Sequence, residues 1–114
     1  MTFPKVTETD VMEIVDQVLA AHHIPHHRNN VGCTKIGRRF IRFGWPGSAD
    51  FIGIIPSGPL EGHFLGVECK APKTGRLSEG QRNWLDMVNR HGGVAIVVDS
   101  LGSLENQLKE REVI

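Results

Sequence analysis

The stretch FLGVECK, residues 64–70, ends an otherwise apolar strand with two charged side chains. Successive side chains of a strand point to opposite faces, so Glu68 and Lys70 share one face while Cys69 points the other way, into the core. A carboxylate and an ammonium group at the end of an apolar strand are costly unless they are paired or functional. The plainer interpretation is a surface ion pair, worth about 0–1 kcal/mol.

A second carboxylate stands at the start of the preceding apolar stretch, DFIGII, residues 50–55. The turn residues at 44–48 (GWPGS) come before this stretch, and the loop residues at 56–59 (PSGP) follow it. A hairpin between the two strands would bring Asp50 close to Glu68. Asp50 alone is as well explained as a turn residue. Two carboxylates and a lysine at adjoining strand ends, however, are a plausible site for a hard divalent cation of the kind that assists phosphodiester hydrolysis.

The first helix begins with the residues of a capping box, Thr7 and Asp10, and continues with apolar residues at helical spacing. At about 100° per residue, Glu8 falls on the same side as Val15, which is the apolar face. Glu8 is therefore positioned either to reach the metal site or to serve as an acid favoured by the helix dipole. Pro25 closes this helical region.

The rest of the chain predicts three further elements after a strand at 36–43 and the two strands above. Ser78 and Gln81 form a second capping box and start a helix. Taken alone, Gln81 is better explained as a cap residue than as a contact to the nucleophilic water or to a phosphate. Residues 94–98 form a strand buried on both faces, and a last helix covers about 103–110. The expected order is α-β-β-β-α-β-α.

Length and composition indicate one domain over residues 1–114. The chain is 39% hydrophobic and 23% charged, as in ordinary globular proteins, and no apolar run approaches a membrane span. No signal peptide is evident, and the two cysteines form no redox or metal motif. We therefore expect a cytoplasmic protein with no membrane partner.

Net charge is zero, but the positive charges are concentrated in the middle of the chain. Residues 26–49 contain five basic side chains and no acidic one, and the loop at 72–77 is also basic. Such a region is either a solvated face or a surface for DNA phosphates. The candidate DNA-binding residues are Arg28, Asn29, Arg38, Arg39, Arg42, Lys73 and Arg76.

Taken together and in order, these segments resemble the VRR-NUC family, the virus-type replication-repair nucleases of the PD-(D/E)xK superfamily. The resemblance extends from about residue 7 to residue 98. It is carried by RNNVG at 28–32, GWPGSAD at 44–50, VECK at 67–70, GRLS at 75–78, and Gln81. One position departs from the family pattern, because Ala49 stands where a proline often precedes the aspartate.

The resemblance implies an α/β restriction-endonuclease-like fold, with a central mixed β-sheet flanked by helices, and hydrolysis of DNA that depends on Mg²⁺ or Mn²⁺. It implies that Asp50, Glu68 and the backbone carbonyl of Cys69 bind the metal, with Glu8 as a further candidate. Lys70 would be the catalytic lysine and Gln81 the motif glutamine. Arg28 and Asn29 match the family's Arg-Asn element, which lies near phosphate or organises the site.

Stand-alone members of the family are phage or bacterial proteins, so the resemblance places this chain in the host cytoplasm. Their likeness to Holliday-junction resolvases implies a structure-selective endonuclease that works as a homodimer, since cutting a symmetric four-way junction needs two sites related by a two-fold axis. A flap or nicking nuclease is an alternative of the same class. Alternatives of another class are a non-catalytic DNA-binding module that keeps the fold and, more weakly, a structural subunit of a packaging or repair complex.

Overall fold

The computed structural model describes residues 4–114 and is built from three helices and six strands in that range. In chain order the elements are α1 (Glu8–Ala21), β1 (His26–Arg28), β2 (Gly32–Ile36), β3 (Arg39–Phe43), β4 (Phe51–Ile54), β5 (Phe64–Cys69), α2 (Glu79–Arg90), β6 (Val94–Val98) and α3 (Leu101–Glu110). The two predicted capping boxes are confirmed, at Thr7 for α1 and at Ser78 for α2. None of the helices within residues 4–114 is long and apolar enough to cross a bilayer.

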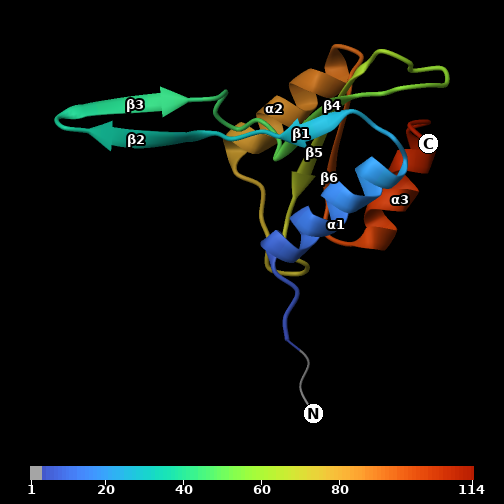
Figure 1. Ribbon diagram of the computed structural model, residues 1–114, viewed down its shortest axis with the longest axis horizontal. Coiled ribbons are helices and arrows are strands. Elements are labelled where there is room, and N and C mark those ends of the chain that lie inside the picture. The colour runs from blue at the N-terminus through green and yellow to red at the C-terminus, as the bar shows by residue number, and fades with distance from the viewer. Residues whose placement is uncertain (1–3) are drawn as a thin grey trace.

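A four-stranded mixed sheet in the order β1-β4-β5-β6 forms the centre of the molecule (Figure 1). The strands β1, β4 and β5 pair antiparallel, and β5 pairs with β6 in parallel. The predicted hairpin between the second and third of the expected strands is confirmed by the β4–β5 pairing. The mixed sheet between helices confirms the expected α/β class.

The helices cover the two faces of this sheet unequally. Buried residues of α1 and α3 form one core with alternate residues of β5 and β6, including Val67 and Cys69. On the other face, Trp84 of α2 packs over Gly66, where an added Cβ would lie 2.8 Å from the indole ring. The burial of Cys69 confirms the alternation predicted for β5, and it leaves Glu68 on the α2 face.

The expected element order is wrong in one region, because residues 26–43 contain three strands instead of one. The predicted strand at 36–43 is interrupted at Gly37, which has a φ of +63° and turns β2 back onto β3. The order is therefore α-β-β-β-β-β-α-β-α. A short polar strand such as β1 shows no apolar alternation, and an isolated glycine within a strand pattern is easily taken for part of the strand.

The hairpin of β2 and β3, residues 32–43, is a separate two-stranded sheet, which we call the arm. Figure 1 shows it projecting away from the helices and the main sheet. Every residue of β3 is exposed, as are all but the first of β2. The arm follows β1, and residues 44–50 lead from its end through Asp50 into β4.

Candidate active site

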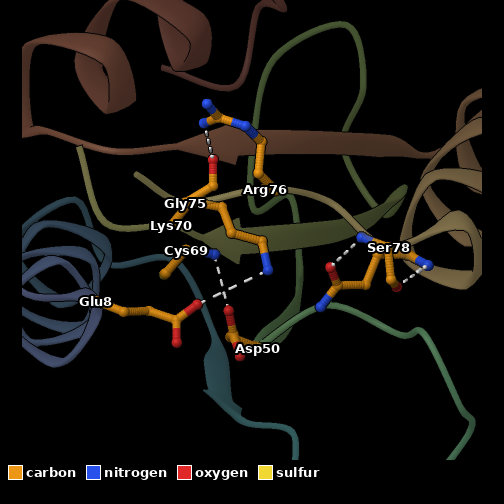
Figure 2. A network of polar contacts seen from close by, with 8 residues as sticks. Glu8, Asp50, Cys69, Lys70, Gly75, Arg76 and Ser78 are labelled. Atoms are coloured by element: carbon orange, nitrogen blue, oxygen red, sulfur yellow. Dashed lines mark hydrogen bonds and ion pairs between the residues drawn. The ribbon is translucent and has the colours of Figure 1, made fainter. Parts of the chain in front are cut away.

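Asp50 lies at the end of the turn that leads from the arm into β4. The side-chain nitrogen of Asn29 donates hydrogen bonds to Ser48 Oγ at 2.7 Å and to the carbonyl of Ala49 at 2.9 Å, which holds this turn against the end of β1. Asp50 Oδ2 accepts a hydrogen bond from the backbone N–H of Cys69 at 2.8 Å (Figure 2). One carboxylate oxygen is thus fixed on β5, and the side chain is held beside the neighbouring carboxyl of that strand.

That neighbour is Glu68, which is only 2% exposed. Its Oε2 atom is buried without a hydrogen-bond partner among the described residues. Burial, a hydrogen bond with Asp50 and the negative charge of Asp50 raise the pKa of Glu68 to about 9, while the charge of Lys70 acts in the opposite direction. A buried carboxyl with an unsatisfied oxygen and a second carboxyl beside it forms a strongly electronegative position.

Lys70 follows the last residue of β5 and lies at the same end of the sheet as the two carboxyls. Its Nζ is 3.8 Å from Glu8 Oε1, in the first turn of α1 (Figure 2). The Lys70 side chain is 14% exposed and that of Glu8 is 49% exposed. Glu8 therefore reaches the site through the lysine, so that one ammonium group lies near three carboxyl side chains.

The donor set suits a hard cation. Magnesium takes oxygen ligands and is commonly held by one or two carboxylates together with water. Asp50 and Glu68 supply two carboxylates, and the unpartnered Glu68 oxygen is the atom that a cation would satisfy. Within residues 4–114, no three His, Cys, Asp or Glu side chains gather in a metal-binding arrangement, and the role of Glu8 as a further ligand stays a prediction.

The Cys69 side chain takes no part in this arrangement. It is fully buried in the core shared with α1 and α3, and burial followed by the negative charge of Asp50 raises the pKa of its thiol. A protonated, buried thiol is neither a metal ligand nor a nucleophile. The contribution of Cys69 that the structure shows is its backbone N–H, which holds Asp50.

Gln81 occupies the third position of α2, and its Oε1 accepts a hydrogen bond from the N–H of Ser78 at 3.0 Å. The cap interpretation of its oxygen is therefore confirmed, and the amide nitrogen is the group left for water or phosphate. Gly47, with a φ of +84°, lets the turn before Asp50 pack against this helix end: a Cβ there would lie 2.5 Å from the carbonyl oxygen of Gly80.

Two clefts lie near the site, and neither is lined by Asp50 or Glu68. One, of about 480 Å³ between α1 and β1, is lined by Arg28 together with Glu8, Glu13 and Asp16. Lys70, Lys73 and Arg76 line the other, of about 460 Å³, beside β6. The guanidinium of Arg76 donates to the carbonyl of Gly75 at 3.0 Å (Figure 2). It also donates to the carbonyl of Lys73 at 3.0 Å, so Arg76 braces its own loop in this structure.

The remaining basic candidates do not join the carboxylates. Arg39 and Arg42 lie on β3, and Arg38 lies in the turn at the tip of the arm. Asn29, predicted as a DNA contact or an organiser of the site, is a bracing residue by its hydrogen bonds.

Sequence reasoning passed over two small residues that shape the site. A Cβ on Gly75 would lie 2.7 Å from Lys70 Cβ, so this glycine lets the basic loop close over the lysine. Ser48 accepts the hydrogen bond from Asn29 and donates one to the Trp45 carbonyl at 2.6 Å. Both residues stand in the segments that carry the family resemblance, but only the folded structure reveals what they contact.

A mixed sheet with an acid–acid–lysine set at the ends of two adjacent strands defines the class of restriction-endonuclease-like nucleases. The sequence model of the VRR-NUC domain matches residues 9–101, most of the 114-residue chain, and the chain belongs to this family. No curated protein and no solved structure matches the chain. Membership makes the protein a nuclease with DNA as its substrate.

Proposed function

We propose that this protein is an endodeoxyribonuclease that depends on Mg²⁺ or Mn²⁺, with Asp50, Glu68 and Lys70 as its central residues. The observation that carries the proposal is the buried Glu68 carboxyl, which has an unpartnered oxygen next to Asp50. A non-catalytic DNA-binding module has no use for such an arrangement, because buried, unpaired carboxyls destabilise a fold and repel phosphate.

The position of each residue suggests its role in the reaction. Asp50 and Glu68, with the Cys69 carbonyl, would hold the divalent ion, which when bound polarises a phosphate and lowers the pKa of a coordinated water. The hydrogen bond from the Cys69 N–H fixes Asp50. Lys70 offers the positive charge that stabilises negative charge developing on the phosphate. Glu8, 3.8 Å from Lys70 Nζ, holds that ammonium group in place.

DNA would reach this site from its basic side. The cleft beside Lys70 carries Lys73 and Arg76, whereas Arg28 in the other cleft lies among the acidic residues Glu8, Glu13 and Asp16. The arm adds Arg38, Arg39 and Arg42 at a greater distance from the carboxylates. Phosphate contacts of this kind position a duplex and make binding sensitive to salt. Gln81 would contact water or phosphate through its amide nitrogen.

For the substrate, we propose structure-selective cleavage of branched DNA, with a four-way junction as the leading candidate and a homodimer in the host cytoplasm as the active form. One chain carries one site, and the symmetric cutting of a junction needs two. A flap or a nicked duplex is the alternative substrate.

The test is cleavage of labelled four-way junction, flap, duplex and single-stranded DNA, each with Mg²⁺, with Mn²⁺ and with chelator. Lys70→Ala is the inactive comparison, and Lys109→Ala, exposed in the last turn of α3, is the matched control. Binding of every substrate without cleavage under any metal condition would favour the DNA-binding module. A preference for flaps or nicks would replace the junction as the substrate.

A further inference from the structure

The arm has two chemically different faces. Directly paired residues of an antiparallel hairpin point to the same side. The pairs Thr34–Ile41, Ile36–Arg39 and Gly32–Phe43 therefore make one face, and Cys33–Arg42 and Lys35–Phe40 make the other. The first, which we call the apolar face, exposes Ile36, Ile41 and Phe43 at 62%, 43% and 45% of their surfaces. An isolated two-stranded hairpin is at best marginally stable in water, so we expect this face to pack against another apolar surface.

The main sheet also has an apolar area that no helix covers. Helix α2 packs against β5 and β6, while the same face of β4 carries no helix. Two hollows of about 370 and 500 Å³ lie there and share Ile52 and Phe64 in their walls. Ile54 and Phe64 are 53% and 40% exposed, and Trp45 at the rim is 62% exposed. We call this apolar area the open sheet face.

The size of the exposed surface agrees with an interface that a single chain leaves uncovered. The chain exposes 7601 Å², against about 6,200 Å² expected for a compact monomer of this mass. The excess of about 1,400 Å² is that of one chain, and it exceeds the roughly 800 Å² that each partner of a standard interface buries. The radius of gyration, 15.1 Å, likewise exceeds the roughly 13 Å of a compact domain of this length.

We propose that the apolar face of the arm docks on the open sheet face of a second copy of this chain, and that the second copy docks its own arm in the same way. Each chain carries both halves of this complementary pair, which is the requirement for a closed two-fold interface. The arm extends away from the body, so the apolar residues toward its tip are carried away from the sheet of their own chain (Figure 1).

This docking leaves Lys35, Arg42 and Phe40 on the uncovered side of the arm. Lys35 Nζ already lies 5.8 Å from the centre of the Phe40 ring, and no acidic residue interrupts residues 17–49. The exchanged arm would thus present a basic surface next to the partner's body. The inference specifies the interface of the homodimer proposed above and rests on that proposal for its link to cleavage.

The experiment measures molecular mass by light scattering and analytical ultracentrifugation in chelator, without DNA, so its outcome does not depend on cleavage. Wild type is expected at twice 12.6 kDa. Ile41→Asp on the arm and Ile54→Asp on the open sheet face are each expected to weaken dimerisation at least about tenfold, since each buries a charge in an apolar contact. Phe40→Asp, on the opposite face of the arm, is the matched control and is expected to remain dimeric.

A mixture of the two disrupted variants tests the exchange itself. The Ile54→Asp chain keeps an intact arm, and the Ile41→Asp chain keeps an intact open sheet face, so the mixture is expected to associate more strongly than either variant alone. Circular dichroism and cooperative thermal unfolding check that each variant is folded. Wild type that stays monomeric at about 100 µM, folded variants that dimerise like wild type, or a mixture no stronger than its parts would overturn the proposal.

Discussion

Replacing Glu68 by glutamine should stabilise the metal-free protein. Glu68 is 2% exposed, and burial and its contact with Asp50 raise its pKa from 4.5 to about 9. An acid whose pKa is higher in the folded than in the unfolded state binds its proton more tightly when folded. Stability is therefore fully retained below pH 4.5 and falls as the pH rises from there toward 9. Glutamine has nearly the same shape and does not ionise, so the stability of the variant should not fall with pH in this way.

The size of the effect follows from the two pKa values. Each pH unit above the unfolded-state pKa costs about 1.4 kcal/mol of stability, so at pH 7 folding of the wild type carries a penalty of about 3 kcal/mol. For a domain of this length, removing this penalty by the glutamine substitution should raise the midpoint of thermal unfolding by on the order of 10 °C. The glutamine amide can also donate to Asp50, which keeps the contact between the two side chains.

The assay is urea or thermal unfolding of both proteins in chelator, at a series of pH values from 4 to 8. The stability difference should be near zero at pH 4 and grow with pH. Mg²⁺ should then stabilise the wild type and not the variant, because the variant lacks the anionic oxygen. A variant no more stable than the wild type at pH 7 would show that Glu68 is not held in a desolvated, electronegative position.

Four further results are expected. Lys70→Ala should abolish cleavage while circular dichroism and DNA binding stay near wild type; cleavage at the wild-type rate would remove the lysine from the active site. Alanine at both Arg38 and Arg42 should lower the slope of log affinity against log salt by about 0.9 for each duplex phosphate that the variant no longer neutralises, and an unchanged slope would place DNA away from the arm. Cys69→Ala should leave cleavage nearly unchanged and lower the free energy of unfolding by about 1 kcal/mol; rapid thiol labelling of the native protein would contradict its burial. Asp50→Asn should weaken divalent-ion binding in calorimetry and abolish cleavage, while DNA binding in chelator tightens; equal metal affinity would make Asp50 a turn residue.

The body of the fold was predictable because its signals are local or periodic. The two capping boxes mark the starts of α1 and α2, and the apolar alternation of β5 assigned Cys69 to the core and Glu68 to the other face. The β4–β5 hairpin followed from the loop between two apolar stretches. These features depend on neighbours in the chain, so a single sequence is enough to predict them.

The arm was not predictable in the same way. Its strands face solvent on both sides in a single chain, so neither face imposes the apolar pattern by which buried strands are recognised. The pairing of Lys70 with Glu8 joins residues that are 62 positions apart in the chain. The hydrogen bonds from Asn29 to the turn join residues about 20 positions apart. Such contacts are set by the packing of α1 against the sheet and by the pairing of β1 with β4, which local sequence does not encode.

The same bracing links the arm to the carboxylates. The Asn29 N–H donates to the Asp50 carbonyl at 2.7 Å, and its side chain holds Ser48 and Ala49, so the two segments that enter and leave the arm are joined beside Asp50. The base of the arm therefore cannot shift without moving the turn that positions this carboxylate. In the proposed enzyme, a duplex lying along a docked arm would be placed relative to Asp50 by this junction. Selection among DNA shapes would then depend on how the two arms are held, while the chemistry depends on Asp50, Glu68 and Lys70.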